Sequence, residues 1–273
     1  MLFDTLQRAI LLSLVLAFLS TISFARDYEF IDVHIHYNDN VWDAITPESA
    51  IQRLKKAGIK HAVVSSTNDD GTQKLYNADT DFVIRSLRPY KSSDHRVGWV
   101  DDVDVIPYLE QRLDTYDYAA IGEFHLQGAQ ADYPVVKKVV QLAKQHDLIL
   151  HIHSDADAIK RVFTQYPEAR IVWAHAGFEY ASTVEEMMDE YKNLWADLSF
   201  RREIYTNDQF LRTWEKLLIK HADRFMIGVD TYIPQRWLKI DNVVAHFKDM
   251  LDALPEDVAH KIANQNAQRV YQQ

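Results

Sequence analysis

The chain has 273 residues, with 40 acidic and 30 basic side chains, so its formal net charge is −10. It contains twelve histidines, only seven glycines and no cysteine. A composition of 47% hydrophobic and 26% charged residues is typical of a globular protein, and it excludes disordered chains, disulfide scaffolds and cysteine–zinc sites. The acidic balance disfavours a nucleic-acid partner, because phosphate backbones are bound by Lys and Arg surfaces. A small molecule is the expected partner.

The first 25 residues are predicted to be a cleaved export signal. No charge interrupts the stretch from Ala9 to Ala25, and Ser23-Phe24-Ala25 places small residues where a signal peptidase cuts. The stretch is only 17 residues long and contains Ser and Thr, so we expect cleavage rather than a stable membrane anchor. The mature chain, residues 26–273, is expected to be periplasmic or secreted. Its sequence is compatible with a homo-oligomer.

Short apolar runs rich in Val, Ile and aromatic residues alternate with amphipathic stretches along the mature chain. Such runs predict buried strands. The eight predicted strands are Glu29–Tyr37, His61–Thr67, Val97–Val103, Ala119–Leu126, Leu148–Asp155, Arg170–Phe178, Leu194–Phe200 and Phe225–Tyr232.

Helices are predicted between these strands. Pro47–Ala57 has Thr46 as a candidate N-cap and Gly58 at its C-terminus, and Pro134–His146 and Ala156–Tyr166 repeat the same apolar spacing. One helix per strand implies a parallel sheet, and eight such units in about 250 residues match a (β/α)8 (TIM) barrel. No Pro/Gly/Ser linker interrupts the run, so a single domain is expected. A doubly wound open sheet is the alternative, but the first turn after a strand lacks its Gly-rich phosphate loop.

Polar side chains lie near the ends of several predicted strands. Alternate strand residues point into a barrel, and those at the C-terminal ends line the face that carries catalysis. Because several imidazoles and two carboxylates would be costly to bury together, a divalent cation is expected among them. Nitrogen and oxygen donors without thiolates suit zinc first, with manganese, iron or nickel as alternatives. The residues concerned are His34, His36, Glu123, His125, His151, His153, His175 and Asp230.

These residues resemble the amidohydrolase superfamily, in particular its amidohydrolase-related (amidohydrolase-2) branch and the neighbouring TatD-type hydrolases. The resemblance rests on the His34-x-His36 pair, Glu123 after Gly122, a histidine of the fifth strand, His175-Ala176-Gly177, Gly228-Val229-Asp230 and the closing segment from Asn264 to Tyr271. It spans residues 29 to 271, nearly the whole mature chain.

The resemblance implies roles for these side chains. His34, His36 and Asp230 would hold one metal, His175 and a histidine of the fifth strand would hold a second, and Glu123 would bridge the two. Relatives carry a carboxylated lysine, a glutamate or no ligand at the fourth strand, so one or two metals per chain are expected. For the fifth strand we favour His153, with His151 as the alternative.

The same chemistry predicts hydrolysis of an ester, lactone, amide or phosphoester bond in a small molecule. A divalent metal lowers the pKa of water toward 7, and Asp230 would act as the general base and then return the proton to the leaving group. Arg201 and Arg202 follow the seventh strand and are candidate substrate ligands, as is His125. Asp197 inside the seventh strand is a candidate partner of the metal ligands.

Three other functions compete. A nonoxidative decarboxylase or hydratase on the same barrel would use one metal and no ligand from the fourth strand, which Glu123 disfavours. A TatD-type nuclease is disfavoured by the net charge and the export signal. A noncatalytic exported protein that binds a metal or a small ligand is the third.

Overall fold

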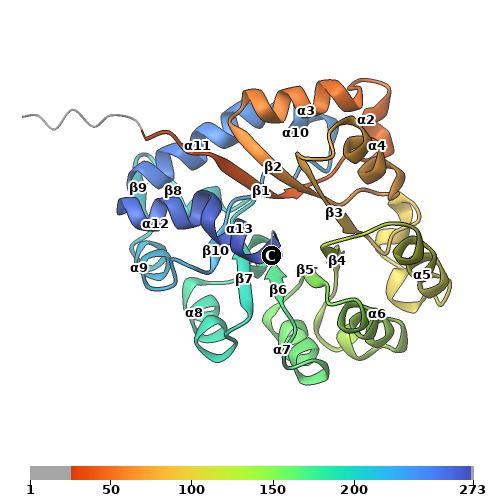
Figure 1. The fold of residues 1–273 in the computed structure, drawn as a ribbon. Helices are drawn as coiled ribbons and strands as arrows, with labels where there is room; N and C mark the ends of the chain where they lie inside the picture. The colour runs from red at the N-terminus through yellow and green to blue at the C-terminus, as the bar shows by residue number, and fades with distance from the viewer. Residues whose placement is uncertain (1–25, 272–273) are drawn as a thin grey trace, which may run out of the picture.

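The computed structural model describes residues 26–271, and the predicted export signal lies outside this part of the chain. Eight strands form one parallel sheet in the order β1-β2-β3-β4-β5-β6-β7-β10. Hydrogen bonds from Val33 N–H to the Ile227 carbonyl (3.1 Å) and from Asp230 N–H to the His34 carbonyl (2.7 Å) join the last strand region to the first. The sheet therefore curls into a barrel, with helices around its outside (Figure 1). The predicted (β/α)8 fold is confirmed.

The strands are short. Their bounds are β1 Phe30–Ile35, β2 Ile59–Val64, β3 Val83–Leu87, β4 Ala120–His125, β5 Ile149–His153, β6 Ile171–Trp173, β7 Leu194–Asp197 and β10 Phe225–Met226, with a separate antiparallel hairpin of β8 Tyr205–Thr206 and β9 Gln209–Phe210.

The α-helices are α2 Asp39–Trp42, α3 Pro47–Lys56, α4 Asp70–Ala78, α5 Val105–Thr115, α6 Pro134–Gln145, α7 Ala156–Gln165, α8 Ala181–Glu190, α9 Arg212–Lys220, α10 Pro234–Trp237, α11 Ile240–Asp252, α12 Glu256–His260 and α13 Asn266–Tyr271. Short 3-10 turns cover Ser93–Arg96, Trp99–Asp101, Gly128–Asp132, Ala174–Phe178 and Arg202–Ile204, and a π-turn covers Lys261–Gln265.

Helix α3 forms as its sequence predicts. The Thr46 hydroxyl accepts a hydrogen bond from Ser49 N–H at 3.3 Å, and Pro47 occupies the first turn, where a missing N–H costs nothing. Ala50, Ile51 and Leu54 are buried against the barrel. Helices α6 and α7 likewise end within one residue of their predicted bounds.

The prediction of a third strand at Val97–Val103 is wrong. The third strand is β3, and the segment Val97–Val103 contains a 3-10 turn with its two terminal valines 78% and 72% exposed. The apolar residues of this segment gave the wrong indication. Trp99 is buried and its indole N–H donates to the His125 carbonyl (3.0 Å), but the segment pairs with no strand among the described residues. Arg85 and Ser86 weaken the apolar pattern of β3.

The later strands end sooner than predicted. Strand β6 stops at Trp173 and β10 at Met226, so His175 and Asp230 lie in the segments that follow them. Both adopt left-handed backbone conformations, with φ values of 56° and 53°. Such conformations are uncommon in residues other than glycine and cluster at functional sites.

Two apolar layers hold the barrel together. The larger lies between the sheet and the surrounding helices. The smaller fills the barrel at the end opposite the polar residues, where Ile31, Val33 and Val63 pack against Ala267, Val270 and Tyr271 of α13. Helix α13 accordingly lies near the centre of the ring of strands (Figure 1). Among residues 26–271, no helix has both the length and the apolar character needed to cross a membrane.

Candidate metal centre

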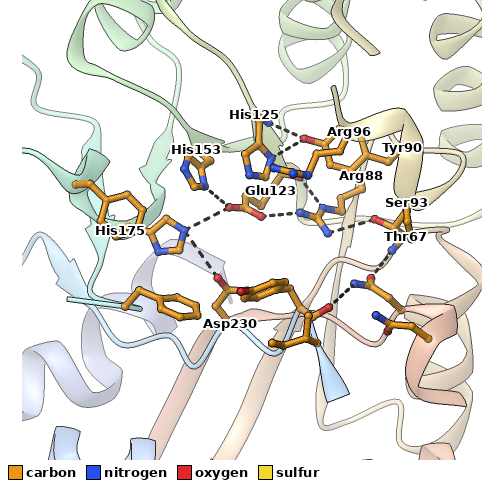
Figure 2. Close-up of a pocket in the computed structure, with 16 residues that line it drawn as sticks. Thr67, Arg88, Tyr90, Ser93, Arg96, Glu123, His125, His153, His175 and Asp230 are labelled. Atoms are coloured by element: carbon orange, nitrogen blue, oxygen red, sulfur yellow. Dashed lines mark hydrogen bonds and ion pairs between the residues drawn. The ribbon is translucent and has the colours of Figure 1, made fainter. Parts of the chain in front are cut away.

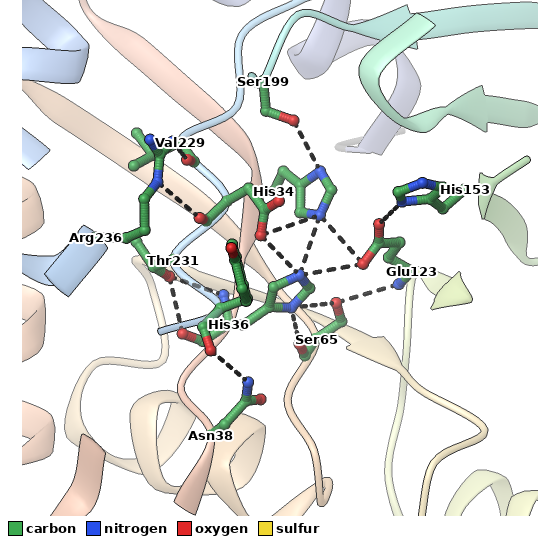
Figure 3. Close-up of polar contacts among 12 residues, drawn as sticks. His34, His36, Asn38, Ser65, Glu123, His153, Ser199, Val229, Thr231 and Arg236 are labelled. Atoms are coloured by element: carbon green, nitrogen blue, oxygen red, sulfur yellow. Dashed lines mark hydrogen bonds and ion pairs between the residues drawn. The ribbon is translucent and has the colours of Figure 1, made fainter. Parts of the chain in front are cut away.

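One buried cluster unites five side chains from four places around the barrel. His34 comes from β1 and His36 directly follows that strand, Glu123 comes from β4, His175 from the turn after β6, and Asp230 from the segment after β10. All five are at most 6% exposed. The structure thus brings these predicted ligands together at the C-terminal end of the barrel (Figures 2 and 3).

The Glu123 carboxylate lies between two groups of imidazoles. Its Oε2 atom is 3.4 Å from His34 Nε2 and 3.3 Å from His36 Nε2. Its Oε1 atom is 2.9 Å from His153 Nδ1 and 3.5 Å from His175 Nε2. One carboxylate oxygen therefore faces the pair His34 and His36 and the other faces the pair His153 and His175, as expected for a carboxylate that bridges two metal positions.

Asp230 closes the cluster from the other side. Its Oδ1 atom is 3.3 Å from His36 Nε2 and 3.8 Å from His34 Nε2, and its Oδ2 atom is 3.9 Å from His175 Nε2. Oδ1 is buried and has no hydrogen-bond partner among the described residues. A buried acceptor without a donor is costly, so this atom is suited to a cation.

In three imidazoles, the hydrogen-bond partner of Nδ1 determines the tautomer and therefore whether Nε2 carries a proton or a lone pair. His34 Nδ1 faces the Asp197 carboxylate at 3.1 Å, His36 Nδ1 faces the Ser65 carbonyl, and His175 Nδ1 faces the Ser199 carbonyl at 3.0 Å. Each Nδ1 must donate to these acceptors, so in the neutral rings each Nε2 carries a lone pair.

Those lone pairs point at one another. His34 Nε2 and His36 Nε2 are 3.1 Å apart, and neither neutral ring has a proton to place between them. Burial lowers the pKa of His34, but the charges of Asp230, Glu123 and Asp197 outweigh it and raise that pKa well above its usual value. The cluster therefore favours a positive charge at this point, and a divalent metal ion fits the donor set.

Burial on its own would raise the pKa of the two carboxyl groups. The neighbouring His34 charge reverses this, so that the pKa of Glu123 lies well below its usual range and the pKa of Asp230 is also lowered. Both groups are ionised. Overlapping sets of three ligands form around them, namely His34–His36–Asp230, His34–Glu123–His175 and Glu123–His125–His153.

The two histidines of β5 lie at different depths. His153 reaches Glu123 and is partly exposed to the cavity. His151 is buried one layer deeper, where its Nε2 lies 3.0 Å from Asp197 Oδ2. This placement supports His153 as the ligand from the fifth strand and gives His151 a place in the layer beneath.

Asp197 organises that deeper layer. The fully buried carboxylate accepts hydrogen bonds from His34 Nδ1 and His151 Nε2, and from the backbone N–H groups of His175 (3.3 Å) and Ser199 (2.9 Å). Partners of this kind orient metal-ligating imidazoles and set their tautomer. The carboxylate suggested by the seventh strand thus contacts one candidate ligand directly.

Arg88 is a site residue that the sequence reading missed. It follows β3, is 4% exposed, and places Nη2 2.6 Å from Glu123 Oε2 and Nε 2.9 Å from the Glu123 carbonyl. Its Nη1 also donates to the Thr67 hydroxyl at 3.2 Å. Had β3 been located correctly, an arginine directly after a barrel strand would have been a visible signal.

The arginines after β7 do not serve the predicted purpose. Arg201 is buried and donates to the carbonyls of His175 (2.8 Å) and Glu179 (3.0 Å), and its guanidinium lies over the Trp214 ring. Arg202 is exposed and lies outside the cavity wall. Arg201 is instead a brace for the turn that carries His175.

His125 does face the cavity. Its ring stacks on His153 with centroids 4.2 Å apart, and its Nδ1 lies 2.8 Å from the Tyr90 hydroxyl. Burial lowers the pKa of His125 to about 3, so the ring is neutral at physiological pH. A neutral His125 ring at the cavity wall can form a hydrogen bond with a substrate without adding a charge to the cavity.

A cavity of about 500 Å³ opens above the cluster. Figure 2 shows Arg88, Tyr90, Ser93 and Arg96 on one side of Glu123, with His153 and His175 on the other. This volume suits a small-molecule ligand.

The family model for amidohydrolases, described as "Amidohydrolase", matches residues 31–273. A search of curated proteins found no match. Solved structures with a similar fold include a protein from Acinetobacter baumannii named as a probable 2-pyrone-4,6-dicarboxylic acid hydrolase, with citric acid bound (14% identity, 90% of this chain and 100% of that chain, TM-score 0.64).

A TatD homologue from Escherichia coli K12 is also similar (16% identity, 91% of this chain and 100% of that chain, TM-score 0.59). A further structure, from Pseudomonas putida, likewise carries the name of a 2-pyrone-4,6-dicarboxylic acid hydrolase (15% identity, 90% and 98% covered, TM-score 0.61). At these identities the likeness establishes the fold alone.

Proposed function

Because the chain belongs to the amidohydrolase family, we propose that it is a metal-dependent hydrolase that cleaves an ester, lactone, amide or phosphoester bond of a small molecule with a metal-activated water. One observation carries the proposal: the Nε2 atoms of three imidazoles, those of His34, His36 and His175, converge on the carboxylate oxygens of Glu123 and Asp230. Of these oxygens, Asp230 Oδ1 has no hydrogen-bond partner among the described residues. An enzyme of this superfamily is shown by the family match.

We assign the ligands to two overlapping positions. His34, His36 and Asp230 would hold one metal, His153 and His175 a second, and Glu123 would bridge them. Zinc is the first expectation for such nitrogen and oxygen donors, followed by manganese, iron or nickel. When bound, the metal would activate water and polarise the substrate's carbonyl or phosphoryl oxygen.

Asp230 is the proposed general base. Its carboxylate is ionised, lines the cavity and faces the imidazoles with both oxygens, so it can accept a proton from water and pass it to the leaving group. Arg236 holds the backbone at this point by donating to the Asp230 carbonyl at 3.2 Å.

Metal analysis and an activity panel test the proposal together. We expect one or two divalent ions per chain, loss of activity on chelation, and recovery on readdition. Asp230→Asn should lower activity about 100-fold or more with metal still bound, as expected for loss of a general base. Asp101→Asn is the matched control, because Asp101 is exposed and does not line the cavity. Full activity of metal-loaded Asp230→Asn would refute the assigned role.

The panel should distinguish competing reactions. Lactones and carboxylate esters belong in it, since two similar folds carry the name of a 2-pyrone-4,6-dicarboxylic acid hydrolase. Release of CO2 by a protein with one metal, undiminished by Glu123→Gln, would indicate a decarboxylase. Cleavage of DNA that stops on chelation would indicate a nuclease.

We also propose that residues 1–25 direct export and that the enzyme acts in the periplasm or outside the cell. The uncharged stretch before Arg26 supports this. N-terminal sequencing of the protein from fractionated cells tests it, with a mature chain beginning at Arg26 as the expected result. A chain recovered intact from the cytoplasm would contradict it.

A further inference from the structure

A second cavity adjoins the first. It has a volume of about 390 Å³ and lies among the segments that follow β3, β4, β5 and β6. The two cavities share Arg96, His125, His153 and Phe178 as wall residues. A ligand with its reacting bond at the metal cluster can therefore extend past Arg96 into the second cavity.

Arg96 is the arginine of this region whose charge is not used within the described chain. Arg88 is paired with Glu123, and Arg236 donates to the carbonyls of Val229 and Asp230. Arg96 has no hydrogen bond, ion pair or aromatic ring as a partner among residues 26–271, and it is exposed.

The carboxylates that line the two cavities already have partners. Glu123 and Asp230 face the imidazoles of the cluster. Asp155, on the wall of the second cavity, accepts the backbone N–H groups of Gly128 (3.1 Å) and Ala158 (2.8 Å) as the N-cap of α7. The fold thus leaves a guanidinium at the junction of two cavities with no anion of its own.

A second polar atom in the same place also lacks a partner. Ser154 lines the second cavity, is 4% exposed, and its hydroxyl makes no hydrogen bond within the described residues. A buried hydroxyl of this kind is normally satisfied by a ligand or by water. Arg96 and Ser154 together mark the second cavity as a place for polar ligand atoms.

We propose that the substrate is a carboxylic acid whose carboxylate binds Arg96, with the scissile bond at the metal cluster and the acid-bearing end at the mouth of the second cavity. This inference rests on the proposed function and names its substrate class. A guanidinium matches a carboxylate in bidentate geometry and in charge. A phosphate monoester, with a charge of about −1.5 to −2, would exceed the single positive charge offered.

Binding and turnover are measured separately on the metal-loaded enzyme. The binding probes are glutarate and its neutral diamide, glutaramide, followed by titration calorimetry. The turnover probes are mono-4-nitrophenyl glutarate and 4-nitrophenyl valerate, which differ by the terminal carboxylate. The variants are Arg96→Gln and, as the control with the same change of charge, Arg202→Gln, which lies on neither cavity wall.

We expect glutarate to bind the wild type more tightly than glutaramide does. Arg96→Gln should weaken glutarate binding about tenfold, which is the lower end of the range of effects for a hydrogen bond to a charged group, because Arg96 is exposed. The ratio of kcat/KM for the acidic ester over the neutral ester should fall by a similar factor. Arg202→Gln should match the wild type. Methyl phosphate is titrated in the same way, and its affinity should not change to a comparable degree in Arg96→Gln.

Equal glutarate affinity in the wild type and Arg96→Gln would overturn the inference, because the acid would then be bound by the metals alone. Absence of glutarate binding to the wild type would overturn it as well. If neither ester is hydrolysed while glutarate binding still depends on Arg96, the ester form of the proposed function fails and the carboxylate site stands.

Discussion

Replacing Arg88 by methionine tests whether the buried negative charge of Glu123 needs a cation next to it. The guanidinium makes three buried hydrogen bonds, to Glu123 Oε2 (2.6 Å), the Glu123 carbonyl (2.9 Å) and Thr67 Oγ1 (3.2 Å). Removing one partner of a buried ion pair costs about 3–5 kcal/mol, since the other charge stays buried. The imidazoles next to Glu123 offset part of this, so we expect a loss near 3 kcal/mol in the metal-free protein.

A bound metal should reduce that loss. With a cation at Glu123 the carboxylate is no longer uncompensated, and the remaining cost is that of the lost hydrogen bonds, about 1–2 kcal/mol. Urea unfolding of metal-free and metal-loaded protein measures both values.

Arg85→Met is the control for the Arg88 substitution. Its guanidinium lies over Tyr76 and donates to Gln73, with no carboxylate partner among the described residues. We expect a loss of about 1 kcal/mol that does not depend on metal. Equal losses for Arg88→Met with and without metal would refute the reasoning, because Glu123 would then not need the cation.

Two further predictions concern the framework of the centre. Asp197→Asn should lower metal affinity about 10–100-fold in a competition titration with a chelating dye, because His34 loses the acceptor that orients it; unchanged affinity would exclude this positioning role. Gly228→Ala should also weaken metal binding, because a Cβ there would lie 2.7 Å from His34 Cβ and 3.4 Å from Ser199 Cβ. Gly98→Ala, where an added Cβ meets nothing within 4 Å, is the control, and equal metal binding by the two variants would contradict the prediction.

The fold was predictable because hydrophobic patterning repeats along the chain. Most strand runs contain one observed strand each, and the predicted cap at Thr46 marks a helix start that the structure shows. The third strand was missed for a physical reason. Its middle carries Arg85 and Ser86, whereas Trp99 and Val100 of the wrongly predicted segment are buried without belonging to a strand. A local run of apolar residues does not by itself distinguish a buried strand from a segment that is buried without being a strand.

Placement of the candidate ligands depended on a different regularity. The alternation of β1, continued one residue past its end, puts His34 and His36 on one side, as the His-x-His spacing predicts. His175 and Asp230 lie beyond their strands in left-handed conformations that no periodicity encodes. The roles of Arg88 and Arg201 depend on partners 35 and 26 residues away, so they emerged only from the tertiary structure.

The end of the barrel opposite the candidate metal centre is closed by α13, which lies far from β1 in the sequence. Ala267, Val270 and Tyr271 pack against Ile31, and the Asn266 amide donates to the carbonyl of Phe225 at 2.8 Å. Without α13, the side chains of Ile31, Val33 and Val63 would have little to cover them at this end of the barrel. Packing of the barrel therefore depends on contacts between segments near opposite ends of residues 26–271, and such long-range contacts form at a high entropic cost during folding.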